Sequence, residues 1–306
     1  MLFKCKVILR QVVRFCTSRL NMKPTFKLSF FYLFLAISFL KVIGCNSGTD
    51  IKTIEDTVAI QPPPDSLART ITIAAADTIL KRKQVPILCY HHIRDWKNSD
   101  SKRARDYIVP IDSFRNQMRL LADSGYQTIN PDQLYNYLAA GEPIPTKSIL
   151  LTFDDTDEEQ YSIAKPEMDK YGFKGVFFIM TVSLGRPNYM TREQVKQLSD
   201  EGHTIASHSW DHKNIKKYVD ADWMIQVEKP TKLLQTITGK PIKYFAYPFG
   251  LWDTTAITGI RKRGMLAAFQ LSDNRHPSQP LYTIRRIIVP GIWSTRTFEK
   301  RIKTSF

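Results

Sequence analysis

The sequence predicts an α/β fold in which strands and helices alternate around a closed or nearly closed parallel barrel. One observation is residues 148–153, SILLTF, a run of mainly apolar and β-branched residues that suits a strand covered on both faces. Another is that similar short runs alternate with amphipathic segments along most of the chain. A third is that several runs end directly at His or Asp, and the carboxyl ends of strands are where β/α folds place their chemistry.

The strands are predicted from apolar runs bounded by polar or turn residues. Such runs occupy residues 85–90, 126–129, 148–153, 175–181, 203–207, 243–247, 266–269 and 284–289. Between them, apolar spacing, capping residues and a following Gly predict helices. These helices occupy residues 112–122, 131–140, 158–171, 191–202, 220–237 and 253–263. Thr191 opens one of them with a T-x-x-Q capping box, whereas residues 71–80 fit either a short strand or a short helix.

The amino-terminal segment has the pattern of an export signal. From Met22 the chain has a basic start, an apolar core at residues 28–40 and then Gly44-Cys45. The core is shorter than the roughly 20 residues of a transmembrane helix and fits the apolar region of a signal peptide. A small residue before Cys resembles the lipobox of bacterial lipoproteins, in which the thiol is lipidated. We therefore expect residues 1–45 to be a signal region, and the mature chain to be an exported cell-envelope lipoprotein anchored at Cys45; the alternative is an uncleaved anchor.

Residues 46–84 follow with little periodicity and a run of three prolines, Pro62-Pro63-Pro64. This composition predicts a linker that tethers the remaining residues, 85–306, a few tens of ångströms from the membrane, on the order of 5–6 Å × √n. Cysteine usage agrees with an exported lipoprotein, because Cys5 and Cys16 would leave with the signal, Cys45 would be lipidated and only Cys89 would stay free. Cys89 lies in an apolar strand pattern, which predicts a buried core residue and no disulfide framework.

The net charge of +15 raises the question of a nucleic-acid partner. Eight Lys and Arg precede Cys45 without any acid among them, and the other 36 are set against 29 Asp and Glu. No basic motif with interleaved aromatic residues is found. We therefore expect no nucleic-acid partner.

Polar or special residues follow four of the predicted strands: His91, Asp154 with Asp155, His208 with His212, and residues 247–250. In a parallel barrel all of them face one mouth. Two imidazoles and one carboxylate are the ligand set of a catalytic divalent metal with open positions, so His208, His212 and one of the two Asp are candidate ligands. Two explanations without a metal remain, namely chance H-x-x-x-H spacing and capping of the next helix by Asp155 or Thr156.

Two of these motifs together resemble a known family. Residues 151–155, LTFDD, with residues 208–212, HSWDH, are similar to the TFDD and H-[ST]-x-x-H signatures of the polysaccharide deacetylases, carbohydrate esterase family four. Residues 245–250, FAYPFG, resemble its third motif. Residues 88–91, LCYH, resemble the start of its circularly permuted branch, that of the poly-N-acetylglucosamine deacetylases. The likeness covers residues 85–289.

The resemblance implies that residues 85–306 form a polysaccharide deacetylase domain, a distorted (β/α) barrel. It implies a hydrolase that uses a divalent metal, zinc or alternatively cobalt or nickel. The family pattern makes Asp154 the general base and Asp155, His208 and His212 the metal ligands. It also makes His91 the general acid, as in the permuted branch.

The third motif implies groups that hold the substrate and its oxyanion. The backbone N–H of Phe249, next to the motif Pro, is expected to help bind the oxyanion, and Tyr247 is the second residue expected there. Tyr247 also stands where many members have the Arg that orients the base, and Arg286 is a candidate substitute whose alternative role is structural. Thr156 stands where the family usually has Gly.

The resemblance also implies the substrate class. We expect removal of N-acetyl groups from a polysaccharide that contains N-acetylglucosamine, whether peptidoglycan, exopolysaccharide or chitin-like material. Two alternatives remain open. One is a non-catalytic envelope lipoprotein that has the same fold and binds glycan, and the other is an esterase for O-acetylated or small substrates.

Overall fold

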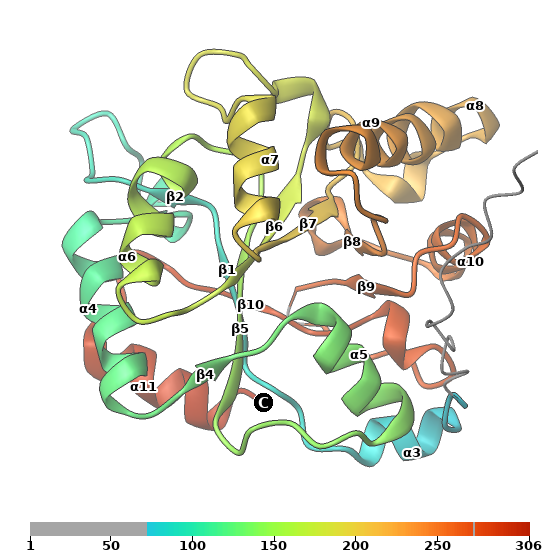
Figure 1. Ribbon diagram of the computed structural model, residues 1–306, viewed down its shortest axis with the longest axis horizontal. Helices are drawn as coiled ribbons and strands as arrows, with labels where there is room; N and C mark the ends of the chain where they lie inside the picture. The colour runs from blue at the N-terminus through green and yellow to red at the C-terminus, as the bar shows by residue number, and fades with distance from the viewer. Residues whose placement is uncertain (1–71, 272) are drawn as a thin grey trace, which may run out of the picture. The chain divides into compact units, whose positions relative to one another are not determined.

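A curled sheet of parallel strands forms the centre of the computed structural model, which describes residues 72–271 and 273–306 (Figure 1). Its strands are β1 (Ile87–Tyr90), β4 (Gln127–Thr128), β5 (Ser148–Phe153), β6 (Gly175–Ile179), β7 (Thr204–Ser207), β8 (Tyr244–Ala246), β9 (Ala267–Phe269) and β10 (Ile287–Ile288). The order across the sheet is β10-β1-β5-β6-β7-β8-β9, and β4 pairs with β5 beside this path. All pairings are parallel. The predicted α/β fold with a parallel barrel is confirmed.

The segment that ends in β10 joins the two edges of this sheet. Leu88 of β1 pairs with Ile287 of β10. A few residues earlier, Ile284 forms a parallel bridge with Phe269 of β9. One short segment therefore bonds to β9 at its start and to β1 at its end, and this double pairing curls the sheet.

Alternate residues of each strand line the inside of the curled sheet. The inner cluster includes Ile87, Leu150, Val176, Phe178, Ala206, Ala246 and Phe269. Leu134 and Leu138 of α5 (Pro131–Ala140) join this cluster. The neighbouring strand residues, such as Leu151 and Phe177, belong to a second cluster with the outer helices. Because strand side chains alternate, Thr152 and Asp154 continue the inner face of β5 toward its carboxyl end.

Helices cover the outer face of the sheet (Figure 1). They are α4 (Ile111–Asp123), α6 (Lys165–Asp169), α7 (Arg192–Asp200), α8 (Asp220–Trp223), α9 (Lys229–Thr238), α10 (Thr254–Lys262) and α11 (Thr295–Thr304). One-turn π-helical segments, Gln160–Ala164 and Met224–Glu228, lead into α6 and α9. The helices predicted between strands are confirmed, whereas α11 was not predicted. A separate two-stranded sheet of β2 (His92–Ile93) and β3 (Ile108–Val109) was not predicted either.

The last part of the predicted linker packs on the domain. Helix α3 (Ala76–Lys81) buries Ile79, which is 2% exposed and belongs to the inner cluster. The Arg82 guanidinium donates a hydrogen bond of 3.1 Å to the carbonyl oxygen of Tyr137 in α5. Residues 76–84 are therefore part of the folded unit. The signal region, Cys45 and residues 46–71 of the predicted linker lie outside the described residues. No helix of the described part of the chain is long and apolar enough to cross a bilayer.

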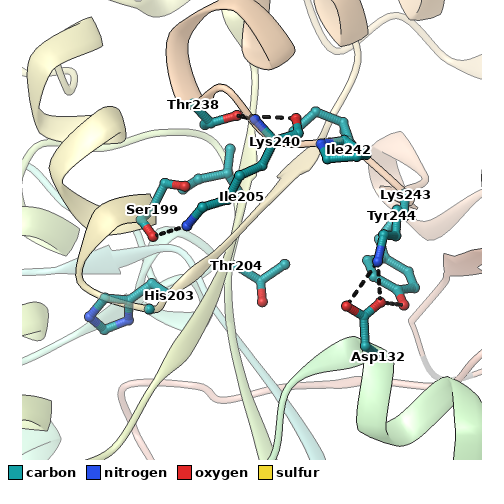
Figure 2. Close-up of a pocket in the computed structure, with 12 residues that line it drawn as sticks. Asp132, Ser199, His203, Thr204, Ile205, Thr238, Lys240, Ile242, Lys243 and Tyr244 are labelled. Atoms are coloured by element: carbon teal, nitrogen blue, oxygen red, sulfur yellow. Dashed lines mark hydrogen bonds and ion pairs between the residues drawn. The ribbon is translucent and has the colours of Figure 1, made fainter. Parts of the chain in front are cut away.

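A hollow of about 280 Å³ lies at the amino ends of β7 and β8 (Figure 2). Its charged groups are paired with one another or with the backbone. Lys243 Nζ lies 3.0 Å from Asp132 Oδ2, and Lys240 Nζ donates to the carbonyl oxygen of Ser199. Parallel strands place this hollow at the end of the sheet opposite the predicted catalytic mouth.

His203, on one wall of this hollow, makes the stability of the fold depend on pH. Its Nδ1 accepts a 3.0 Å hydrogen bond from Gly175 N–H, and burial lowers its pKa to about 4. The neutral ring is therefore the native form, and its contribution to stability is complete above about pH 6.5 and is lost as the pH falls toward 4. This loss amounts to about 3 kcal/mol.

We expect His203→Gln to make the unfolding free energy less dependent on pH between 7 and 4.5, measured by urea denaturation. Equal pH dependence in the two proteins would contradict this assignment.

Candidate active site

Asp154 and Asp155 follow β5 and direct their carboxylates to two different sets of partners. Asp154 stays on the inner face and is 2% exposed. Asp155 has a φ of 73°, a left-handed conformation that is uncommon for residues other than Gly. This turn brings the carboxylate of Asp155 within 3.4 Å of His208 Nε2. The turn therefore brings both carboxylates to one region at the end of β5.

Left-handed conformations are concentrated at this mouth. Six described residues other than Gly have a positive φ, and five of them follow the carboxyl ends of β5, β7 and β8: Asp155, Thr156, Ser209, His212 and Phe249. Each such residue costs on the order of 1–3 kcal/mol, so the surrounding contacts must hold it in place. For Thr156, Oγ1 accepts a 2.8 Å hydrogen bond from the N–H of Met180 after β6. The φ of 76° explains why Gly is usual at this position, and the hydroxyl explains how Thr is held there.

Asp155, His208 and His212, which we call the ligand cluster, meet beyond β5 and β7. The Nε2 atoms of His208 and His212 lie 3.4 and 3.7 Å from Asp155 Oδ1. That oxygen is buried and accepts no well-formed hydrogen bond. A tetrahedral ion with bonds of about 2.0–2.2 Å separates its ligand atoms by about 3.3–3.6 Å, close to the spacing observed here. The donor set and the unsatisfied oxygen therefore fit a divalent cation.

The ring orientation of His208 also suits this role. His208 Nδ1 lies 2.8 Å from the carbonyl oxygen of Ala246, which can only accept, so Nδ1 carries a proton and Nε2 is left to face Asp155. Burial alone would lower the pKa of His208, but the charges of Asp154 and Asp155 outweigh it and raise the pKa. Burial and the charge of His208 lower the pKa of His212 to about 4. Cation binding would release the proton from His208 Nε2.

Arg286 holds Asp154 from inside the sheet. Its two terminal nitrogens donate hydrogen bonds of 2.6 and 2.7 Å to the two oxygens of Asp154, and both side chains are almost completely buried. Arg286 Nε donates to the carbonyl oxygen of Gln270, which fixes the guanidinium plane. Burial alone would raise the pKa of Asp154, but Arg286 outweighs it and the pKa falls well below its ordinary value. Arg286 thus takes the orienting position that Tyr247 leaves empty.

Sequence reasoning missed two further contacts to Asp154. Cys89 is buried as predicted, and its thiol lies 3.5 Å from Asp154 Oδ2. The side-chain amide of Gln160, in the π-helical segment, donates to the carbonyl oxygens of both His91 and Asp154. A lone Cys and a lone Gln carry no sequence signal for such roles, although a π-helical turn often marks a functional site.

Comparison with known proteins agrees with this geometry. A sequence profile described as polysaccharide deacetylase matches residues 141–268, a stretch that contains Asp154 and the whole ligand cluster. Residues 141–268 are therefore similar to a polysaccharide deacetylase domain. YxkH of Bacillus subtilis (strain 168), whose name assigns it to the polysaccharide deacetylases, is 28% identical over 218 residues, 69% of this chain and 74% of its own. A poly-beta-1,6-N-acetyl-D-glucosamine N-deacetylase of Staphylococcus aureus (strain MRSA252) is 27% identical over 246 residues, 73% of this chain and 83% of its own.

Solved structures share the fold. The deacetylase PplD of Streptococcus pyogenes, in complex with acetate, superposes with a TM-score of 0.66 at 21% identity and covers 72% of this chain and 98% of its own. IcaB of Ammonifex degensii superposes with a TM-score of 0.60 at 22% identity and covers 72% of this chain and 97% of its own.

His91, which precedes the matched residues 141–268, lies beside Asp154. One ring nitrogen of His91 is within 4.8 Å of an Asp154 oxygen, and Nδ1 is buried without a hydrogen-bond partner. The ring packs edge-on against Tyr107, with 5.1 Å between centroids. Burial lowers the pKa of His91, although Asp154 opposes the change. The ring is therefore neutral at pH 7 in the absence of ligands.

The two residues predicted from the third motif, Tyr247 and Phe249, lie in different environments. Phe249 is 57% exposed, and its ring is 4.3 Å from that of His212. Tyr247 is completely buried in the outer cluster with its ring against Phe245, and its hydroxyl has no partner. The side chain of Tyr247, predicted to lie at the substrate, is thus packed in the core and does not reach the mouth.

The pair formed by Arg286 and Asp154 can be tested through stability. Removing one partner of a buried ion pair leaves an uncompensated charge, so we expect Arg286→Met to lower the unfolding free energy by about 3–5 kcal/mol. The double variant Arg286→Met/Asp154→Asn should lose less unfolding free energy than the sum of the losses in the two single variants. Urea denaturation of the four proteins gives the coupling. Arg285→Met is the matched control, because Arg285 is partly exposed and contacts two uncharged groups, the Gln84 side chain at 3.4 Å and the ring of Phe306. Additive losses would contradict the pairing.

Proposed function

We propose that this protein is a metal-dependent hydrolase that removes N-acetyl groups from a polysaccharide containing N-acetylglucosamine. The observation that carries this proposal is the ionised carboxylate of Asp154, held by Arg286 next to the ligand cluster. His208 Nε2 is 3.8 Å from Asp154 Oδ2 and 3.4 Å from Asp155 Oδ1, so a base and a cation site adjoin one another. The Staphylococcus aureus relative, named for deacetylation of poly-beta-1,6-N-acetyl-D-glucosamine, supports the substrate class.

The ligand cluster would hold the cation through Asp155 Oδ1 and the Nε2 atoms of His208 and His212. A divalent cation bound there, with zinc as the expected metal, would polarise the amide carbonyl and acidify a water molecule. Asp154 would accept the proton as this water attacks the carbonyl carbon. Oδ1 of Asp154 keeps a second lone pair beside its bond to Arg286, whereas Oδ2 also faces the Cys89 thiol, so the ion pair leaves room for that proton on Oδ1.

Departure of the amine requires a proton on the nitrogen when the carbon–nitrogen bond breaks and acetate forms. His91 would supply it, because a positioned imidazole can donate a proton near neutral pH. Since His91 is neutral in the resting protein, the proton it donates is the one that Asp154 takes from water, within 4.8 Å of the ring. The backbone N–H of Phe249 would help stabilise the oxyanion.

Substitution of the base and of one ligand should separate chemistry from metal binding. We expect Asp154→Asn to lower acetate release from N-acetylglucosamine oligomers at least about 10²-fold, the lower range for a general base, with cation content unchanged. We expect His208→Ala to lose both the cation and activity. Acetate release and metal content are measured in parallel. Asp112→Asn, at an exposed position of α4, is the control for an Asp-to-Asn change.

Each rival function has its own outcome in this assay. Oligomer binding without acetate release, unaffected by Asp154→Asn, would identify a non-catalytic glycan-binding protein. Faster release from short O-acetyl esters than from oligomers would identify an esterase. Full activity in both variants would overturn the proposed site.

We further propose that the domain is exported and held at the cell envelope by a lipid on Cys45. The lipobox-like Gly44-Cys45 after an apolar segment supports this proposal. We expect Cys45→Ser to abolish incorporation of radiolabelled palmitate and to move the protein out of the detergent fraction. An unchanged distribution and unchanged labelling would exclude the anchor.

A further inference from the structure

A second group of metal-ligating side chains lies outside the ligand cluster. His92, Asp157 and Glu159, which we call the His92 cluster, bring one imidazole nitrogen and two carboxylate oxygens within 4.8 Å of one another. His92 Nδ1 lies 3.0 Å from Glu159 Oε1 and 3.3 Å from Asp157 Oδ2. None of these three atoms takes part in the proposed hydrolysis, so the arrangement has no explanation in that function.

Asp157 has an unsatisfied oxygen directed into this group. The residue is 4% exposed, and its Oδ2 is buried and accepts no well-formed hydrogen bond although His92 Nδ1 is close. Removing a carboxylate oxygen from water without a partner is costly. A bound cation would satisfy this oxygen.

The backbone holds two of the three donor residues, His92 and Asp157, in place before any ligand arrives. His92 pairs with Ile108 of β3, and its N–H donates to the carbonyl oxygen of Tyr107 at 3.0 Å. Asp157 forms an antiparallel bridge with Tyr189 in the loop after β6. The donors therefore need little rearrangement to bind a ligand, which favours binding.

The composition of the His92 cluster also suits a cation, because two carboxyl groups face a single imidazole. The guanidinium of Arg94, two residues after His92, is bound to both oxygens of Asp100 at 2.8 and 2.9 Å. The positive charge of Arg94 is therefore largely compensated by Asp100. The side chain of His92 is 38% exposed, which leaves a route from solvent.

We propose that His92, Asp157 and Glu159 form a second divalent-cation site, distinct from the ligand cluster. The donor separations are 3.0 and 3.3 Å. For an ion with bonds of about 2.0–2.2 Å, neighbouring ligand atoms are about 2.8–3.1 Å apart in octahedral geometry and about 3.3–3.6 Å apart in tetrahedral geometry, so the observed separations suit a divalent cation. Two oxygens and one nitrogen make it a harder donor set than that of the ligand cluster. Mn²⁺ should therefore compete with Zn²⁺ better here than at the ligand cluster.

Counting bound metal tests this site without any activity measurement. The full chain and its variants are loaded with Zn²⁺, dialysed and analysed by plasma mass spectrometry. We expect about two equivalents in the wild type, about one in Asp157→Asn and in Glu159→Gln, and about one in Asp155→Asn. Retention of one equivalent also shows that a variant is folded at its other site. Glu158→Gln, which changes the intervening carboxylate, should keep both equivalents. When the proteins are loaded with Mn²⁺ instead, the His92 cluster should retain more Mn²⁺ through dialysis than the ligand cluster. Asp157→Asn should therefore lose more bound Mn²⁺ than Asp155→Asn.

Three results would overturn this site. One equivalent in the wild type and none in Asp155→Asn would mean that the chain has a single cation site. Two equivalents in both Asp157→Asn and Glu159→Gln would place the second ion elsewhere. Loss of both equivalents in every His92-cluster variant would mean that the ligand cluster and the His92 cluster do not bind cations independently.

Discussion

The bidentate pairing of Arg286 with Asp154 links the fold to the proposed chemistry. Arg286 lies in the short segment that bonds to β9 through Ile284 and to β1 through Ile287, so closure of the sheet positions the guanidinium. Its charge keeps a buried carboxylate ionised where burial alone would favour the neutral acid. An isolated carboxylate in this interior would take up a proton and lose its value as a base. The curled sheet and the ionised base therefore depend on each other.

Left-handed residues at the strand ends have a second structural role. Adjacent residues of an extended strand point to opposite faces, so Asp155 could not reach the inner side with the φ of a strand. The left-handed turn redirects it, and similar turns at Ser209 and His212 follow β7. The buried sheet beneath these turns supplies the stability that strained residues need. Such strain at the mouth favours a geometry fixed before substrate arrives over one formed on binding.

Much of this arrangement could be predicted from sequence because its signals are local. Continuous apolar runs predict buried parallel strands, and a polar residue directly after such a run is at its carboxyl end. Helix α11 lacked this signal, since Phe298 and Ile302 are its only buried residues and form a narrow apolar stripe. The partners of Asp154 are distant from it in sequence. The sequence makes Arg286 only a candidate, with a structural role as the alternative, and carries no local signal for Cys89; closure of the sheet brings both to Asp154.

A single turn after β5 joins most of these features. Within residues 154–160 it carries the proposed base, one candidate ligand, two carboxylates of the His92 cluster and the amide of Gln160. That amide donates to the carbonyl oxygens of His91 and Asp154, so it ties the ends of β1 and β5 together. Asp155 and Asp157 are close enough that the charge of each opposes ionisation of the other. A cation at either cluster would weaken this repulsion and favour ionisation at the other. Because the two groups share one backbone turn, each would also help to fix the position of the other.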